Sequence, residues 1–489
     1  MGTAQLRLQD RRWQLLCLAL AILTLYRAAV ASRLPLYLDE AQYWTWSLHP
    51  AWGYYSKPPM VAWLIALSTV ASQGELAIRL GTLLLHPLSA LLIAATGWRI
   101  GGRGTGLLAG LLFASLPLVG FNSLFMTTDA PLVLCWAAAV ASLWRALQTN
   151  AWRHWLLLGA AAGAGLLSKY SMALLLPSIA LVFALPAWRA QWRNPRPWLA
   201  ALLALLIFLP NLLWNAQADF VSLRHTADIS QLDRALFHPA RLAEFVGAQF
   251  LCMGPLAFAA LLAALLSAST WRDPALGFLA AMTLPFLALI GLQALLARAN
   301  ANWAAPAYVG GSLLVAARWR MAARPRLRLA CAAILSNLVF LSVFYHYQEL
   351  ARLAGIELTR RGDPYARLLG WPQAGAAVRQ ALARHPGALL ATVTREEFAL
   401  LSYYTGVPPD RVRIWNPQQQ RSNHYHLVAD AARNPGATYL FATRTPLGPA
   451  TASAFAHWRA LGSASVPLYR DEALTLYLYC GRHFQGYRP

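Results

Sequence analysis

The chain has 489 residues, of which 58% are hydrophobic and only 12% are charged, and its mean hydropathy is +0.43. This composition excludes an ordinary soluble domain and is typical of polytopic membrane proteins. The formal net charge of +22 could suggest a nucleic-acid partner. The arginines instead lie at alternate ends of apolar runs, which argues against nucleic acid.

A helix that crosses a bilayer needs ~20 mostly apolar residues, and the sequence contains about eleven such runs. They lie near 13–31, 76–98, 106–125, 130–148, 155–170, 171–188, 198–215, 246–267, 274–296, 303–317 and 329–347. The run 60–72 is apolar but too short to cross, which predicts a re-entrant or interfacial helix. We therefore expect residues 1–348 to form an all-α polytopic membrane domain.

The arginines orient these spans by the positive-inside rule, with the N-terminus in the cytoplasm. The residues that mark the cytoplasmic side are Arg7, Arg11, Arg12, Arg99, Arg103, Arg145, Arg153, Arg189, Arg193, Arg196, Arg272 and the run 318–328. Loops 32–75, 126–130, 216–245 and 297–302 then face outward, with everything after about residue 348. The first apolar run lacks a cleavage site of the A-x-A type, so we expect it to be retained as a span.

Residues 349–489 are predicted to form a small extracytoplasmic α/β domain, because about 140 residues can bury a core of their own. The run 388–393 resembles a strand that passes into a capped helix at 396–404. Residues 371–384 have amphipathic helical spacing, and 438–443 and 474–479 resemble strands. No Gly-rich phosphate loop occurs in this domain.

Only two of the 41 basic residues are lysines, Lys57 and Lys169, and both fall at the outer face. This usage indicates a need for a compact ammonium rather than a planar guanidinium. Charge at membrane depth is costly, so each lysine predicts a functional polar cavity. The alternative is a snorkelling side chain at each position.

The first outer loop, 32–75, is the densest polar region, and it carries Asp39 and Glu40 before Lys57. A carboxylate can act as a general base toward an acceptor hydroxyl, and a nearby ammonium can neutralise a phosphate leaving group. Two prolines after Lys57 restrict its backbone. The tyrosines of the loop, which can donate hydrogen bonds, are Tyr43, Tyr54 and Tyr55. We interpret Trp44, Trp46 and Trp52 as an ordinary aromatic belt at the membrane interface.

Polar residues at the other outer turns extend the candidate site. Asp129 is either the N-cap of the next span, with a proline in the first turn, or a site residue. Near Lys169, the glycines at 159, 163 and 165 are interpreted as packing positions. His225 lies in loop 216–245. The segment with Arg298, Asn300 and Asn302 offers a cation and two amides as ligands of a sugar or phosphate.

No cofactor or metal site is predicted. The five cysteines stand singly, and His and acidic residues do not recur at ligand spacing. The glycine-rich segment 101–106 follows no strand, so we interpret it as a short cytoplasmic turn rather than a dinucleotide loop. Because the outer face of a bacterial inner membrane generally lacks nucleotide-activated donors, the charged loop points to a lipid-linked phosphate donor.

The order of these motifs resembles the bacterial branch of the dolichyl-phosphate-mannose protein mannosyltransferase family, which includes lipid A aminoarabinose transferases and galacturonosyl transferases of lipopolysaccharide cores. The matching motifs are Asp39-Glu40 with Tyr43, residues 54–59, 128–131, 167–170 and 300–303, with 370–371, 398–406 and 423–425 in the terminal domain. Five motifs in order make the resemblance specific.

The resemblance implies a GT-C fold and an inverting transfer of a sugar from a polyprenyl-phosphate donor. Asp39 would be the base, Lys57 with Tyr43 and Tyr54 would hold the donor phosphate, and Asp129 and Lys169 would line the same cavity. The remaining candidate donor-binding residues are Glu40, Tyr55, His225, Arg298, Asn300 and Asn302. The acceptor is lipid A, another glycolipid, a glycan or a protein, and the enzyme would sit in the bacterial inner membrane with its active site facing the periplasm.

Two departures from the family pattern bear on specificity. Gln42 stands where the aminoarabinose enzymes carry Arg, and Ser56 replaces the Glu before the lysine. They argue against aminoarabinose as the donor sugar and against a metal site built on that Glu. The rival functions are a transporter or flippase for lipid-linked sugars, which predicts inverted repeats and broken helices, and a scaffold without enzymatic activity.

Overall fold

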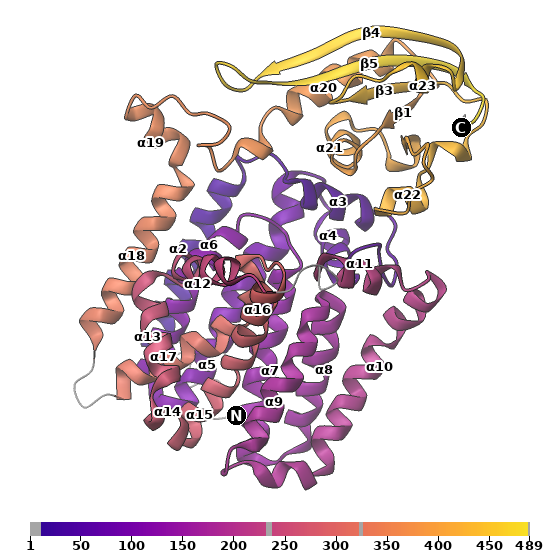
Figure 1. Cartoon of the computed structure of the whole chain (residues 1–489). Coiled ribbons are helices and arrows are strands. Elements are labelled where there is room, and N and C mark those ends of the chain that lie inside the picture. Colours follow the sequence, from indigo (N-terminus) through magenta and orange to yellow (C-terminus); the bar gives the residue numbers. More distant parts are fainter. Residues whose placement is uncertain (1–10, 231–236, 322–325, 488–489) are drawn as a thin grey trace. The chain divides into compact units, whose positions relative to one another are not determined.

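The computed structural model describes residues 11–230, 237–321 and 326–487 (Figure 1). Arg7, part of the basic run 318–328 and part of loop 216–245 lie outside these ranges. The chain divides into two compact units. The helical unit contains the described residues of 1–32 together with Lys57–Leu64 and Arg79–Tyr345, and the C-terminal unit contains Arg33–Ser56, Ile65–Ile78 and the described residues from 346 onward.

Apolar helices with few charges build the helical unit. Its elements, two of which begin or end in the other unit, are α2 (Arg11–Ala31), α4 (Met60–Ser68), α5 (Glu75–Ser115), α6 (Pro117–Asn122), α7 (Asp129–Thr149), α8 (Trp152–Ser168), η1 (Tyr170–Leu174), α9 (Leu175–Ala184), η2 (Arg189–Arg193), α10 (Pro195–Gln217), α11 (Val221–Ser230), α12 (Pro239–Met253), α13 (Pro255–Leu266), α14 (Ala268–Arg272), α15 (Pro274–Ala281), α16 (Leu284–Leu296), η3 (Ala301–Ala304), α17 (Ala307–Met321) and α18 (Leu327–Tyr345). The short helix predicted after Lys57 is present as α4, with nine residues.

The chain is a multi-pass membrane protein. Within the described ranges, six helices are long and apolar enough to cross a membrane. The count is seven if α12 and α13, between which the chain bends by 116°, form one broken span. The sequence predicts about eleven spans, and the lower count has a structural reason. Several of the predicted runs fold into helices shorter than a full span, such as α8 with 17 residues and α17 with 15.

The long helix α5 contains the predicted run 76–98 and the first part of the run 106–125, and it reverses direction between them at Gly101 and Gly102. Both residues have non-helical backbone angles, and φ of Gly102 is +79°. Beyond this point the Cβ position of Gly110 comes within 3.0 Å of Ala94 Cβ. On a straight helix these residues would lie more than about 20 Å apart. The glycine-rich segment is therefore a turn between two helical arms, as predicted.

The C-terminal unit is a mixed five-stranded sheet with flanking helices (Figure 1). Its elements are α3 (Leu38–Ser47), α19 (Tyr347–Leu353), η4 (Ala366–Leu368), α20 (Trp371–Ala383), β1 (Leu389–Thr392), α21 (Arg395–Thr405), η5 (Pro409–Arg411), β2 (Val412–Ile414), α22 (His424–Val428), η6 (Ala431–Arg433), β3 (Tyr439–Thr443), α23 (Pro449–Ala452), β4 (Phe455–Pro467) and β5 (Ala473–Phe484).

The strand order is β2-β1-β3-β5-β4. β1 pairs in parallel with β2 and β3, whereas β5 is antiparallel to both β3 and β4. The predicted strands at 438–443 and 474–479 and the predicted capped helix are present as β3, β5 and α21. β4 is missing from the prediction because its segment, rich in Ala, Ser and Gly, has mostly exposed residues and no apolar alternation.

Candidate active site

Asp129 is the centre of a buried polar group in the helical unit. Its Oδ1 lies 2.7 Å from Lys169 Nζ, and its Oδ2 accepts a hydrogen bond of 2.9 Å from Asn302 Nδ2. The side chain of Asp129 is 4% exposed and that of Lys169 is 17% exposed. Three residues that the sequence places at separate outer turns therefore meet at one carboxylate.

The local backbone explains this meeting. Asp129 is the first residue of α7, whereas the N-cap is Thr128, and both carboxylate oxygens of Asp129 bond to side chains from other elements. The N-cap interpretation of Asp129 is therefore wrong. Lys169 follows the last residue of α8 with extended angles, φ −160° and ψ 135°, and so breaks the helix before η1. Asn302 lies in η3.

A second polar layer lies beside Lys169. The hydroxyl of Tyr170 is 3.3 Å from Asn211 Oδ1 and accepts a hydrogen bond of 3.3 Å from Asn215 Nδ2. Both asparagines come from α10 and are fully buried. Because buried amides in a membrane span require partners, this layer extends the polar region of Asp129 toward α10.

Three buried basic residues are absent from the sequence prediction. Arg79 is fully buried, and its Nη1 donates a hydrogen bond of 2.6 Å to Ala31 O. Arg27 is also buried, with a bond of the same length from Nη2 to Ala114 O, and His86 is buried in α5. A usable signal was present, since each residue lies in or beside an apolar run, where an ionisable side chain indicates a site.

The proposed base, Asp39, lies in the first turn of α3 in the C-terminal unit. Its Oδ1 is 3.5 Å from Arg395 Nη1, and its side chain is 35% exposed. Among the described residues its Oδ2 has no partner. Glu40, in contrast, is fully buried and caps the helix, because its Oε2 accepts a hydrogen bond of 3.0 Å from Tyr37 N–H. Asp39 is therefore partly exposed, whereas Glu40 has a structural role as the cap of α3.

The aromatic residues of the first outer loop pack inside the C-terminal unit. Tyr43, Tyr55 and Trp46 are buried, and the ring of Tyr54 stacks on that of Trp46 at 4.6 Å. The hydroxyl of Tyr54 lies 3.0 Å from Trp46 O and accepts a hydrogen bond from Ala51 N–H. Burial raises the pKa of Tyr54 to about 12. This hydroxyl holds the loop together, and a contact to donor phosphate stays a prediction.

The aromatic-belt interpretation is wrong for two of the three tryptophans. Trp46 is enclosed by Tyr54 and by His424, whose ring lies 5.4 Å away. Trp44 donates its indole N–H to Gln73 Oε1 at 2.9 Å. These rings are buried because the loop packs within the C-terminal unit, and only Trp52 is exposed.

The other candidate residues are distributed over both units. Lys57 is half-buried and belongs to the helical unit, whereas Asp39 belongs to the C-terminal unit, so their joint action on one lipid headgroup stays a prediction. His225 is half-buried on α11. Arg298 and Asn300 are exposed between α16 and η3. Neither Asp129 nor Lys169 forms a hydrogen bond with His225, Arg298 or Asn300.

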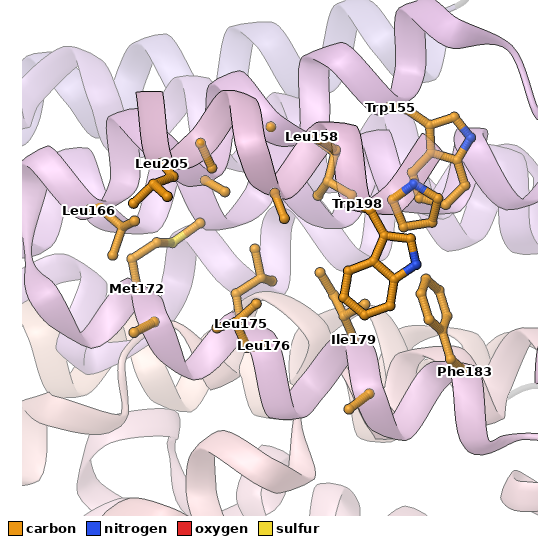
Figure 2. Close-up of a pocket in the computed structure, with 18 of the residues that line it drawn as sticks. Trp155, Leu158, Leu166, Met172, Leu175, Leu176, Ile179, Phe183, Trp198 and Leu205 are labelled. Atoms are coloured by element: carbon orange, nitrogen blue, oxygen red, sulfur yellow. The ribbon is translucent and has the colours of Figure 1, made fainter. Parts of the chain in front are cut away.

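An apolar cavity of about 440 Å³ lies between α8, η1, α9 and α10. Figure 2 shows Leu166 and Met172 at one end and Trp155, Trp198 and Phe183 at the other. The first two residues flank Lys169 in the sequence. The cavity is lined only by apolar and aromatic side chains, which suits a hydrocarbon chain.

Close approach of α8 and α10 forms one wall of this cavity. The Cβ position of Gly159 is 2.5 Å from Ala200 O, and that of Gly163 is 2.7 Å from Ile207 Cβ. Only glycine fits such contacts, which confirms the interpretation of these glycines as packing positions. Within the described ranges, no group of three or more His, Cys, Asp or Glu residues could hold a metal ion.

Comparison with known proteins finds a family model and several relatives that are similar to this chain. Residues 56–214 match the family model for dolichyl-phosphate-mannose-protein mannosyltransferase. The chain is 36% identical over 282 residues to the lipid A galacturonosyltransferase RgtD of Rhizobium johnstonii, which covers 57% of this chain and 59% of that protein.

A second relative is the undecaprenyl phosphate-alpha-4-amino-4-deoxy-L-arabinose arabinosyl transferase of Pseudomonas aeruginosa, 34% identical over 169 residues, or 32% of this chain and 30% of that protein. The chain thus spans less than two thirds of the length of these relatives.

The fold is similar to that of a solved structure, ArnT from Cupriavidus metallidurans bound to undecaprenyl phosphate, with a TM-score of 0.65 and 16% identity. This similarity covers 95% of this chain and 97% of ArnT. The matches confirm the predicted family resemblance, and the agreement with ArnT concerns the fold of nearly the whole chain.

Proposed function

Because the chain is related to the glycosyltransferases of the dolichyl-phosphate-mannose-protein mannosyltransferase family, we propose that it is an inverting membrane glycosyltransferase. It moves a sugar from a polyprenyl-phosphate donor to a hydroxyl of lipid A or another part of lipopolysaccharide. The observation that carries this proposal is the 36% identity to RgtD over 282 residues.

The donor is held by both its lipid and its phosphate. Its polyprenyl chain occupies the apolar cavity between α8, α9 and α10, and Leu166 and Met172 at one end of this cavity flank Lys169 in the sequence. Lys57 neutralises the phosphate. Lys169 gives one of its three N–H donors to Asp129, which leaves two for a phosphate oxygen.

Transfer is a single displacement at the anomeric carbon. The acceptor oxygen attacks this carbon from the face opposite the donor, and the polyprenyl phosphate leaves with the electron pair of the broken C–O bond. Asp39 takes the proton of the acceptor hydroxyl on Oδ2, the oxygen that Arg395 leaves open. The leaving phosphate gains negative charge in the transition state, so the ammonium of Lys57 contributes to turnover.

The same proposal includes the orientation of the chain in the membrane. The helices that are long and apolar enough to span a membrane cross the bacterial inner membrane. The N-terminus lies in the cytoplasm, and residues 349–489 with the loop 32–75 face the periplasm. The placement of arginines at alternate ends of the runs supports this orientation.

The test is an in vitro transfer assay with the purified full chain in proteoliposomes, a radiolabelled polyprenyl-phosphate sugar and lipid A. The expected result is label in lipid A, with the loss of label in the Asp39→Asn variant. Movement of the donor across the bilayer without transfer would indicate a transporter or flippase instead. The bent pair α12 and α13 is the feature that such a function would use.

A further inference from the structure

Arg395 of α21 contacts two side chains of α3. Its Nη1 donates a hydrogen bond of 3.0 Å to Gln42 Oε1 and lies 3.5 Å from Asp39 Oδ1. Residues 39 and 42 are one turn apart on α3 and present neighbouring side chains. A single guanidinium nitrogen therefore bridges the proposed base and the residue next to it on the same helix face.

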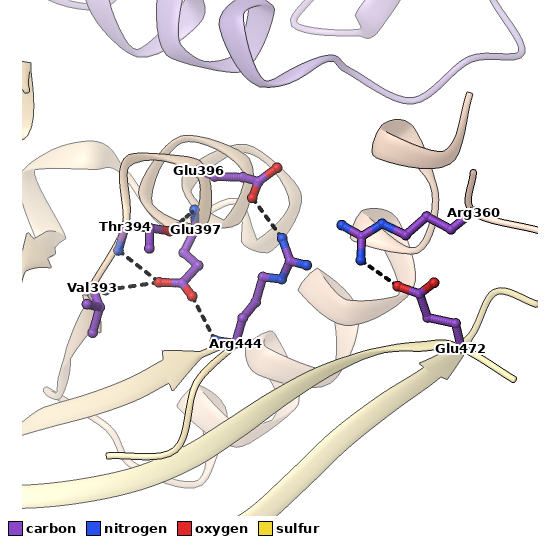
Figure 3. A network of polar contacts seen from close by, with 7 residues as sticks. All are labelled: Arg360, Val393, Thr394, Glu396, Glu397, Arg444 and Glu472. Atoms are coloured by element: carbon purple, nitrogen blue, oxygen red, sulfur yellow. Dashed lines mark hydrogen bonds and ion pairs between the residues drawn. The ribbon is translucent and has the colours of Figure 1, made fainter. Parts of the chain in front are cut away.

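The backbone that carries Arg395 is fixed on two sides (Figure 3). Arg395 follows the N-cap Thr394, whose side chain accepts a hydrogen bond of 3.2 Å from Glu397 N–H. In return, Glu397 Oε2 accepts from Thr394 N–H at 2.9 Å. The other oxygen, Glu397 Oε1, accepts from the N–H of Arg444 at 2.7 Å. This reciprocal cap ties the first turn of α21 to the end of β3, so the position of Arg395 is set by the sheet.

The helix that carries Asp39 is fixed to the same body. Thr45 Oγ1 of α3 lies 2.9 Å from the hydroxyl of Tyr425. Just before α3, Leu36 N–H donates a hydrogen bond of 2.7 Å to the hydroxyl of Tyr404 in α21. Asp39 and Arg395 thus stand on two elements that are held together independently of their own ion pair.

We infer that Arg395 is a positioning residue of the active site: it holds Oδ1 of Asp39 so that Oδ2 faces the acceptor hydroxyl. The inference rests on the proposed function. The residue Gln42 completes the arrangement, because its amide oxygen accepts from the same nitrogen.

Stability alone does not explain the pair. The side chains of Arg395 and Asp39 are 44% and 35% exposed, and exposed ion pairs contribute little to folding. A base, in contrast, must be held within a small distance of its target, and a misplacement of about 1 Å can lower turnover about a hundredfold. The ion pair between Arg395 and Asp39 therefore affects turnover, through the orientation of Asp39, more than it affects folding stability.

The experiment compares Arg395→Gln, Arg395→Lys and Gln42→Leu with a matched control, Arg444→Gln. The control removes a neighbouring ion pair of the same helix turn, 2.9 Å between Arg444 Nη1 and Glu396 Oε2, and leaves the backbone contact of Arg444 in place. The transfer assay gives kcat and KM for the acceptor, and thermal unfolding reports folding.

Arg395→Gln is expected to lower kcat about ten- to a hundredfold with KM within about twofold, because the contact acts on the base in the transition state. Arg395→Lys recovers part of the loss, and Gln42→Leu, which leaves α21 intact, lowers kcat in the same direction. Arg444→Gln keeps the parent values.

The inference is overturned if Arg395→Gln or Gln42→Leu keeps the parent kcat, if the loss appears only in KM, or if Arg444→Gln loses as much. In these cases the parent protein still transfers sugar, so the proposed function stands. Absence of transfer by the parent protein itself would remove both.

Discussion

Replacement of Lys169 by Met should destabilise the helical unit through the charge it leaves behind. The carboxylate of Asp129 is 4% exposed and would lose its partner at 2.7 Å. Breaking a buried ion pair by removing one side costs about 3–5 kcal/mol. Because Asn302 Nδ2 still donates to Oδ2, we expect the lower end, about 3 kcal/mol.

The reverse change, Asp129→Asn, should cost less, about 1 kcal/mol. The ammonium of Lys169 keeps an amide oxygen as acceptor and reaches solvent through its 17% exposed surface. The asparagine would place an NH₂ group toward Asn302, whose own amide must then turn over. The double variant Lys169→Met with Asp129→Asn should be more stable than Lys169→Met alone, because no buried charge remains.

The stability order of these variants is measured by thermal unfolding in detergent. The readout is the fraction of protein that remains monodisperse on size-exclusion chromatography after heating. Lys169→Met should lower the midpoint on the order of 5–10 °C. The reasoning is refuted if Asp129→Asn is the less stable single variant, or if the double variant falls below Lys169→Met.

Three further predictions address other parts of the molecule. Asp39→Asn should lower transfer about 10²–10⁴-fold at unchanged thermal stability, as measured by turnover with a radiolabelled donor; near-parent turnover would reject the base. Burial lowers the pKa of His424 from 6.5 to about 4. The stability that the neutral imidazole contributes is therefore present above about pH 6.5 and is lost as the pH falls toward 4. A His424→Asn variant should unfold with a weaker pH dependence over this range, and an identical dependence would contradict the assignment. Gly159→Ala places a methyl group 2.5 Å from Ala200 O and should destabilise by about 2 kcal/mol, whereas Gly247→Ala, with nothing within 4 Å, should be neutral or slightly stabilising; equal midpoints for the two would disprove the close packing of α8 and α10.

The sequence predicts the buried group at Asp129 in part, because its members stand at the ends of apolar runs. There a polar residue interrupts a strong local pattern, as Lys169 does after α8 and Asn302 does before α17. The position of these polar residues at the ends of apolar runs does not show which of them are in contact. The ion pair at 2.7 Å depends on the packing of α7 against α8. A sequence period can mark the packed face of a helix, but it does not identify the helix that packs against it.

The pair of Asp39 and Arg395 shows the same limit more strongly. It joins residues from opposite ends of the chain, at a separation where no spacing rule applies. Burial of Trp46 and Tyr54 also depends on this long-range packing, since the sequence around them is typical of a membrane interface. The residues Arg27 and Arg79 were within reach of sequence reasoning, because a basic residue in an apolar segment already indicates a special environment.

The membership of α3 in the C-terminal unit has a consequence for biosynthesis. Residues 33–56 and 65–78 pack with residues from 346 onward, so the ribosome completes the early segment long before its partners exist. At about 5–20 residues per second, the roughly 270 intervening residues take on the order of 15–50 s. During this interval the nascent loop, with Trp44, Trp46 and Tyr54, lacks the partners that later bury its aromatic rings. Folding of the C-terminal unit is therefore a late step that follows synthesis of the residues from 346 onward.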